Sequence, residues 1–126
     1  MTYIYAIQHN ITKKIYIGKT KNVEKRYFTH LYELRKNKHK CQDMQKDFYK
    51  FGEDFSVYVL EEIENGKEEE YYNGRLIPRD RIREVYWMEK YNTLTDGYNV
   101  QDFQSKKMLN PKNFPFKQGL PEVKED

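Results

Sequence analysis

The sequence predicts a small mixed α/β domain in which a three-stranded antiparallel sheet is flanked by helices. Two short β-rich segments, residues 3–8 and 14–18, are separated by a turn-like pentapeptide, which predicts a β-hairpin. Apolar residues recur at helical spacing over residues 22–36 and 79–91. A third β-rich run, residues 55–63, lies between these two helical segments and supplies the third strand.

Each strand of the predicted hairpin carries tyrosine on one face. Side chains alternate across a strand, so Tyr3, Tyr5 and Ile7 lie on one face of the first strand. By the same rule Tyr16 and Gly18 share a face of the second strand. If the two faces coincide, Tyr5 and Tyr16 lie together on one side of the sheet.

The helix predicted over residues 22–36 carries two stripes. Arg26 and His30 are four residues apart and are therefore surface neighbours on the helix. Together with Glu33 they form a polar stripe, which is either a solvated face or part of a site, and the pattern alone leaves both readings open. The neighbouring apolar stripe consists of Val23, Tyr27, Leu31 and Leu34.

The following segments are predicted as a helix and a strand. Residues 41–51 form the helix, and Gly52 is a natural C-terminal stop. Residues 55–63 carry apolar side chains on both faces, which predicts a central strand covered on both sides. Residues 64–77 are acidic and rich in turn residues, and they receive no assignment.

Glu84 stands on an unusual face of the helix predicted over residues 79–91. It shares that face with Trp87, Met88 and Tyr91. A carboxylate buried among such side chains requires a salt bridge, a hydrogen bond or a metal ion. An ion pair with a neighbouring arginine and a metal site both remain open at this point.

The 126 residues fit one domain, which we predict over residues 1–101. Three of the four prolines fall in residues 102–126, which we predict to be an extended tail that contacts DNA through its lysines and phenylalanines. A single cysteine rules out an internal disulfide and favours a reducing compartment. No apolar run is long enough for a membrane span, so we expect a soluble, cytoplasmic protein with no membrane partner.

Charge is distributed unevenly along the chain. Residues 1–50 contain 12 Lys or Arg and 4 Asp or Glu, whereas residues 51–70 contain 1 and 8. The basic half indicates either a polyanionic partner or an ordinary lysine-rich surface.

Taken together in order, these residues resemble the GIY-YIG nuclease family, most closely the catalytic domains of phage-type homing endonucleases. The resemblance covers roughly residues 3–100. It depends on two half-motifs, Tyr3-Ile4-Tyr5 and Tyr16-Ile17-Gly18, and on four single residues: Arg26 in "EKR", His30, Glu84 three residues before Trp87, and Asn99 in "GYN".

The resemblance implies the GIY-YIG fold and a metal-dependent DNA endonuclease, a phage or mobile-element enzyme acting on double-stranded DNA in a bacterial host. It implies one Mg²⁺ or Mn²⁺ per active site, with Glu84 as the metal ligand. Arg26 would bind phosphate oxygens through its forked donors, and Asn99 would fix Glu84 or the backbone near it. Double-strand cleavage would require a homodimer, transient pairing or sequential nicking.

By the same resemblance Tyr5 takes the role of general base and Tyr16 a supporting role, although the two roles could be exchanged. His30 would hydrogen-bond a tyrosine hydroxyl or pass its proton on. A free tyrosine titrates near pH ~10, so nearby cations must lower its pKa for this role.

Four further residues are predicted to meet the substrate: Gly18, Lys19, Lys21 and His39. Gly18 would let the chain turn tightly and let a phosphate approach the backbone. The two lysines would collect the DNA backbone, and His39 matches a histidine found in only some family members.

The chain departs from the family pattern at Tyr3, where the leading glycine is missing, and over residues 64–80, which are longer than in the phage enzymes. A non-catalytic DNA-binding module on the same scaffold is the first alternative. A restriction or repair nuclease that needs a partner is the second.

Overall fold

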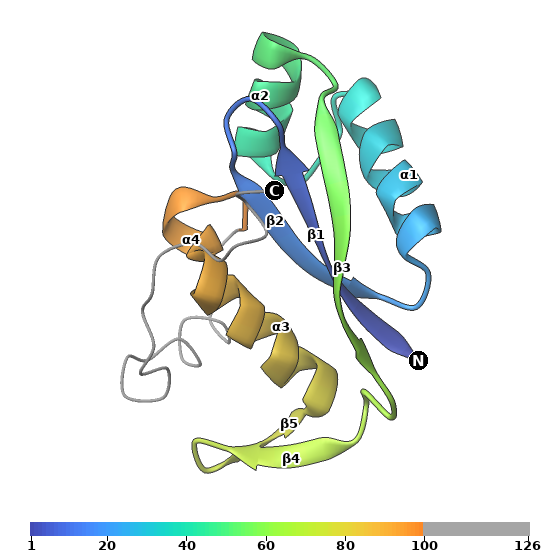
Figure 1. Ribbon diagram of the computed structural model, residues 1–126, viewed down its shortest axis with the longest axis vertical. Coiled ribbons are helices and arrows are strands. Elements are labelled where there is room, and N and C mark those ends of the chain that lie inside the picture. The colour runs from blue at the N-terminus through green and yellow to red at the C-terminus, as the bar shows by residue number, and fades with distance from the viewer. Residues whose placement is uncertain (100–126) are drawn as a thin grey trace.

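The computed structural model describes residues 1–99. In chain order its elements are β1 (Thr2–His9), β2 (Ile15–Thr20), α1 (Val23–Arg35), α2 (Gln42–Phe51), β3 (Phe55–Ile63), β4 (Glu69–Tyr72), β5 (Arg75–Pro78), α3 (Arg79–Tyr91) and α4 (Thr93–Asp96). An antiparallel sheet with strand order β2-β1-β3 forms the middle of three layers, and helices cover both of its faces (Figure 1). The predicted fold class is therefore confirmed. The predicted domain boundary at residue 101 and the tail lie outside the described residues.

Each face of the sheet has its own apolar core. The face that carries Tyr5 packs against α1 and α2, whereas the face that carries Ile4 packs against α3 and α4. β1 contributes to both cores, since its side chains alternate and nearly all are buried. None of the helices within residues 1–99 has the length and apolar character needed to cross a bilayer.

The β1–β2 hairpin forms as predicted. Its register pairs Tyr5 with Gly18 and Ile7 with Tyr16, so Tyr5 and Tyr16 are diagonal neighbours on one face. Their ring centres are 6.2 Å apart. The predicted pairing of the two tyrosines is therefore confirmed.

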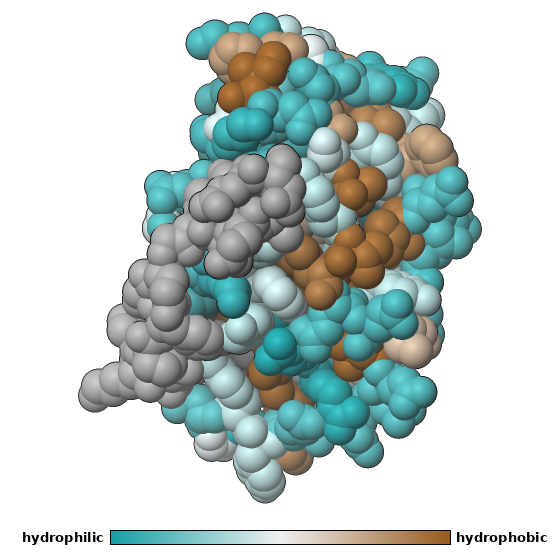
Figure 2. Space-filling model, in the orientation of Figure 1, coloured by the Kyte–Doolittle hydropathy of each residue, from teal (hydrophilic) through white to brown (hydrophobic). Residues whose placement is uncertain are grey.

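The prediction that β3 is the central strand is wrong. β1 is central, and β3 pairs only with β1 among the described strands. Tyr58 and Leu60 pack against one core, but Val57 and Val59 on the other face are 37% and 54% exposed. Figure 2 shows apolar surface over this part of β3. Apolar side chains on both faces therefore did not mean that both faces are covered.

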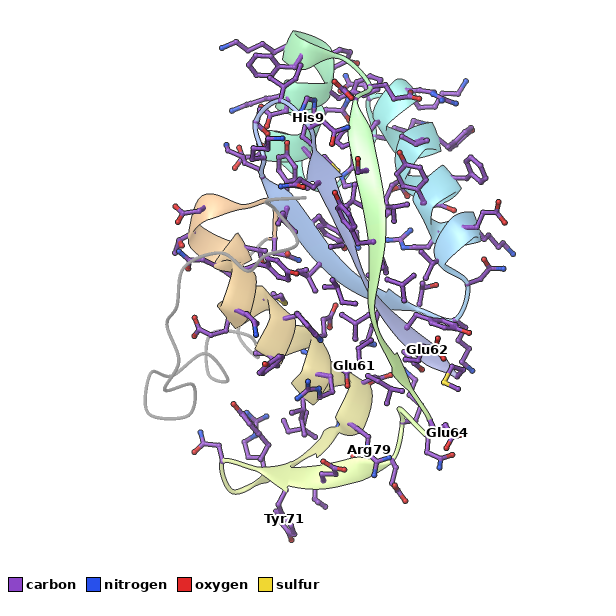
Figure 3. All side chains as sticks on the ribbon, in the orientation of Figure 1. His9, Glu61, Glu62, Glu64, Tyr71 and Arg79 are labelled. Carbon is purple, nitrogen blue, oxygen red and sulfur yellow. The ribbon has the colours of Figure 1, made fainter. Side chains whose placement is uncertain are left out.

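The unassigned acidic segment forms a second hairpin, β4–β5. Asn73 and Gly74 form its turn with φ angles of 56° and 79°, as a tight two-residue hairpin turn requires. Arg79 joins the hairpin to α3, since its guanidinium lies 2.7 Å from carboxylate oxygens of both Glu68 and Glu70 (Figure 3). The segment is thus an ordered addition at the N-terminal end of α3.

Candidate active site

A cavity of about 320 Å³ lies between α1, α3 and the loop that precedes α2. Six of the ten predicted site residues line it, although they come from five separate parts of the chain. This convergence is the main structural support for a site. The lining residues are Tyr16, Arg26, His30, Glu33, His39, Lys40, Cys41, Arg81, Glu84, Met88 and Asn99.

The other four predicted residues lie beside or behind the cavity. Tyr5 and Gly18 are buried behind Tyr16. Lys19, at the end of β2, lies close enough to Glu84 to lower the pKa of that carboxyl. Lys21 is exposed in the loop before α1 and does not line the cavity.

Gly18 provides space for the ring of Tyr5. A Cβ atom at this position would lie 2.5 Å from the Tyr5 hydroxyl oxygen and 2.6 Å from its Cζ atom. Such contacts are too close for any side chain, so the glycine lets the tyrosine lie flat across β2. The expectation that Gly18 makes a tight turn is wrong, because it lies within β2.

The two tyrosines differ in exposure but share an electrostatic environment. Tyr16 reaches the cavity, whereas Tyr5 is only 1% exposed. Burial raises the pKa of both hydroxyls above the ordinary value for tyrosine. The Arg26 guanidinium acts in the opposite direction on both, so it lies beside the pair and favours their ionised forms.

His30 is buried, so it does not belong to a solvated polar face of α1. One ring nitrogen, Nε2, lies 2.9 Å from the Tyr5 hydroxyl, and the ring packs edge-on against Tyr16. Burial, and after it the charge of Arg26, lowers the pKa of His30 to about 3. The imidazole is therefore neutral at physiological pH.

His39 reaches His30 from the loop before α2. The Nε2 atom of His39 lies 2.7 Å from Nδ1 of His30. Ligand atoms of His30, Glu33 and His39 all lie within 4.8 Å of one another, a separation that one metal ion could span. This cluster adjoins Glu84 in the same cavity but does not include it.

Glu84 points into the cavity from the second turn of α3. Its carboxylate makes an ion pair with Arg81, with 2.7 Å between Nη1 and Oε1. Burial raises the pKa of Glu84, while Arg81 and Lys19 lower it. The ion pair that the sequence left open is therefore present. With this ion pair formed, the Glu84 carboxylate still lines the cavity, where a cation can approach it.

Asn99 bonds to the edge of β2 and not to Glu84. Its Oδ1 accepts from the backbone N–H of Ile17 at 2.8 Å, and its Nδ2 donates to the Ile17 carbonyl at 2.9 Å. The side-chain amide thus completes the hydrogen-bond ladder where a further strand would pair.

Arg81, Lys40 and Glu33 line the cavity but are not among the predicted site residues. Arg81 precedes Glu84 by three residues and Glu33 follows His30 by three, spacings that place helical side chains together. The spacing could have identified Arg81, and Glu33 already belongs to the predicted polar stripe of Arg26 and His30. Lys40 lies in the loop before α2, where no periodicity indicates which way a side chain points.

Comparison with known proteins agrees with this geometry. The sequence profile of the GIY-YIG catalytic domain matches residues 1–99. The chain belongs to the GIY-YIG family. Intron-associated endonuclease 1 of Enterobacteria phage T4 is 34% identical over 99 residues, which cover 79% of this chain and 36% of that protein. The chain therefore matches little more than a third of the length of this relative.

Two solved structures share the GIY-YIG fold of this chain. The catalytic domain of homing endonuclease I-TevI aligns with a TM-score of 0.64 at 32% identity, over 81% of this chain and 100% of that one. A glutamate-to-alanine variant of the same domain aligns with a TM-score of 0.62 at 31% identity, over 81% and 96%. Residues 1–99 are thus a GIY-YIG endonuclease catalytic domain homologous to that of I-TevI.

Proposed function

We propose that this domain hydrolyses phosphodiester bonds of double-stranded DNA with the help of one divalent metal ion, as a homing-type endonuclease. The observation that supports this most strongly is the composition of the cavity. It combines the carboxylate of Glu84, the guanidinium of Arg26 and the hydroxyl of Tyr16. Hydrolysis of a phosphodiester needs a cation site, charge neutralisation on the phosphate and an oriented water molecule.

Tyr16 is better placed than Tyr5 to meet the attacking water, because it lines the cavity and Tyr5 does not. We therefore exchange the two roles: Tyr16 orients the water and, after losing its own proton to solvent through the cavity, accepts the proton of that water, and Tyr5 supports Tyr16 from behind. Burial raises the pKa of both hydroxyls, and Arg26 beside them offsets part of this rise and is available to bind a phosphate oxygen. His30 holds Tyr5 by the hydrogen bond to its hydroxyl.

Glu84 is the residue that would hold the metal ion. Its side chain is only 12% exposed, yet it faces the cavity and offers hard oxygen donors. A single carboxylate, completed by waters and a phosphate oxygen, suits Mg²⁺ or Mn²⁺. When bound, such an ion supplies charge neutralisation and makes a bound water more acidic. Arg81 already pairs with this carboxylate, so it would share Glu84 with the ion.

The charges around the cavity favour DNA as the substrate. Arg26, Lys40 and Arg81 line it, and Lys19 lies next to Glu84. The acidic residues at the end of β3 are Glu61, Glu62 and Glu64; Glu61 accepts hydrogen bonds from Arg83 and Trp87 of α3, and Glu64 lies near the β4–β5 hairpin, away from α2 (Figure 3). A single cavity acts on one strand at a time, so double-strand cleavage would require two sequential nicks or transient pairing of two copies.

Cleavage of supercoiled plasmid tests the proposal. We expect nicked or linear DNA with Mg²⁺ and intact plasmid with EDTA. A gel-shift assay on the same samples measures binding separately. Intact plasmid in Mg²⁺ with DNA still bound would contradict hydrolysis and favour the non-catalytic DNA-binding module.

A further inference from the structure

A chain of hydrogen bonds connects the N-terminal end of α2 to the buried tyrosine of β1. The backbone N–H of Cys41 donates to Nδ1 of His39 at 3.0 Å. Nε2 of His39 then lies 2.7 Å from Nδ1 of His30. Nε2 of His30 finally lies 2.9 Å from the hydroxyl oxygen of Tyr5. Both Tyr5 and His30 are only 1% exposed, so water has little access to this end of the chain.

The chain has a defined direction because it begins at a backbone amide. An amide N–H can only donate, so Nδ1 of His39 is an acceptor and carries no proton. The His39 proton is therefore on Nε2, which donates to Nδ1 of His30. The His30 proton is in turn on Nε2, which donates to Tyr5. A second proton on either ring would place two hydrogens in one contact, so both imidazoles are neutral.

The geometry of the two histidines shows that a hydrogen bond joins them. Their ring planes are 28° apart, and their centres are separated by 5.0 Å. That separation is about the 2.7 Å contact plus two ring radii, so the two nitrogens point at each other nearly in the ring planes. This is the geometry of an in-line N–H···N hydrogen bond and not of stacked rings.

The same order argues against a metal ion at the cluster of His30, Glu33 and His39. A metal-bound histidine normally donates its second ring N–H to a nearby acceptor. His39 does the reverse, because its second nitrogen accepts from Cys41. Its Nε2 therefore carries a hydrogen where a metal would need a lone pair.

We propose that His39 is a positioning residue for the nuclease site, which holds the proton of His30 on Nε2 so that Tyr5 receives a hydrogen bond. This inference rests on the proposed function of the site. It goes beyond the substrate contact expected of His39, because His39 acts here through His30.

The direction of the bond to Tyr5 determines which form of the tyrosine it stabilises. A donor aimed at the hydroxyl oxygen favours the ionised form, whereas an acceptor would favour the neutral form. His30 as donor therefore acts together with Arg26 and against the effect of burial. The same donor turns the hydrogen of the Tyr5 hydroxyl away from His30.

The order can be measured directly by NMR on the ¹⁵N-histidine-labelled chain at neutral pH. Long-range ¹H–¹⁵N spectra distinguish the protonated from the unprotonated ring nitrogen. His9 provides an internal reference, because its Nδ1 accepts from the Ile11 amide and its Nε2 donates to the Gly52 carbonyl. We expect His9, His30 and His39 all to carry the proton on Nε2. A His30 with its proton on Nδ1 would overturn the proposal.

Two variants test whether His39 sets the state of His30. The amide nitrogen of His39→Gln still donates to His30, so the His30 proton stays on Nε2. The carboxylate of His39→Glu can only accept, so it draws the His30 proton onto Nδ1. If His30 keeps the same tautomer in both folded variants, the proposal is wrong. Should His39→Glu fail to fold, the wild-type and His39→Gln spectra still decide the order.

Plasmid cleavage then connects the tautomer to activity. We expect His39→Gln to cleave at least about tenfold faster than His39→Glu, since positioned proton-transfer partners contribute 10² or more. Equal rates would overturn the positioning role. Zn²⁺ that removed the His39 Nε2 proton at one equivalent would also overturn it, in favour of a metal cluster. An inactive wild type would contradict the proposed function, while the spectra would still decide the order of protons.

Discussion

Tyr5 owes its place in the site to the absence of a side chain at Gly18. The two residues face each other across β1 and β2, and the Tyr5 ring occupies the space of the missing Cβ. The half-motif glycine is therefore a packing requirement, and its effect on activity would pass through the tyrosine.

Gly18→Ala is expected to displace the Tyr5 ring and to lower the free energy of unfolding by about 1–3 kcal/mol, as for other overpacked cores. Urea denaturation measures the change. In a Tyr5→Leu background the shorter side chain does not reach the new methyl group, so the cost of Gly18→Ala should shrink. The same cost in both backgrounds would show that another contact is responsible.

Burial of neutral His30 makes the stability of the domain depend on pH. The pKa of His30 is about 3 in the folded chain and 6.5 when unperturbed. As pH falls below about 6.5, the unfolded chain takes up a proton that the folded chain does not. The free energy of unfolding should therefore fall, by about 2 kcal/mol from His30 between pH 7 and pH 5.

His30→Gln is the matched variant for this pH effect, because it keeps an N–H donor for Tyr5 and does not titrate. Its free energy of unfolding should fall less between pH 7 and pH 5 than that of the wild type. His39 still contributes in the variant, since burial lowers its pKa as well. An identical loss in both proteins would mean that His30 is not buried in its neutral form.

At the scale of elements, hydrogen bonds from the segment after α4 close the outer edge of β2. The edge of β2 is closed by Asn99 and by the Tyr98 backbone N–H, which donates to the Ile15 carbonyl. The same edge carries Tyr16, so its closure holds one wall of the cavity in place.

Asn99→Ala is expected to lower the free energy of unfolding by about 1–3 kcal/mol, since two backbone groups of Ile17 lose their partner. Asn99→Asp keeps the acceptor for the Ile17 N–H but loses the donor. Amide hydrogen exchange at Ile17 should therefore speed up more in the alanine variant than in the aspartate variant. Unchanged exchange at Ile17 in both would contradict the role of Asn99 at this edge.

Most helices and strands could be predicted from periodicity, because their apolar residues lie on the faces that neighbouring elements cover. The position of β3 could not, because strand order depends on long-range pairing that a single segment does not encode. Val57 and Val59 made β3 look covered on both faces, although these two side chains are exposed. The β4–β5 hairpin was missed because its strands have only four residues each and β4 begins with two acidic residues.

Most residues of the site could be predicted from the sequence, but the hydrogen-bond partners of these residues could not. The residue types and their order pointed to one cavity, since the family motif combines them. Helical spacing does not reveal the partner that a side chain finds in another layer. His39 is such a case, because its hydrogen bond to His30 crosses from the loop before α2 to α1.

At the scale of the whole molecule, DNA binding should depend on the cations around the cavity. Lys40→Ala is expected to weaken binding and to reduce the slope of log affinity against log salt by about 1, as for one phosphate contact. Fluorescence anisotropy in EDTA measures both without cleavage. Lys50→Ala is the matched control, because Lys50 is exposed at the end of α2 and does not line the cavity. Equal slopes for the two variants would contradict the proposed DNA-binding side.

The central claim is that the cavity hydrolyses DNA through a metal ion held by Glu84. The most direct test compares plasmid cleavage rates in Mg²⁺ for the wild type, Glu84→Gln and Glu62→Gln, with folding checked by circular dichroism. Glutamine keeps the size of the side chain but removes the charge that binds the ion, so Glu84→Gln should be at least about 100-fold slower. Glu62 is exposed on β3, and its variant should cleave like the wild type. A folded Glu84→Gln that cleaves at the wild-type rate would contradict the account.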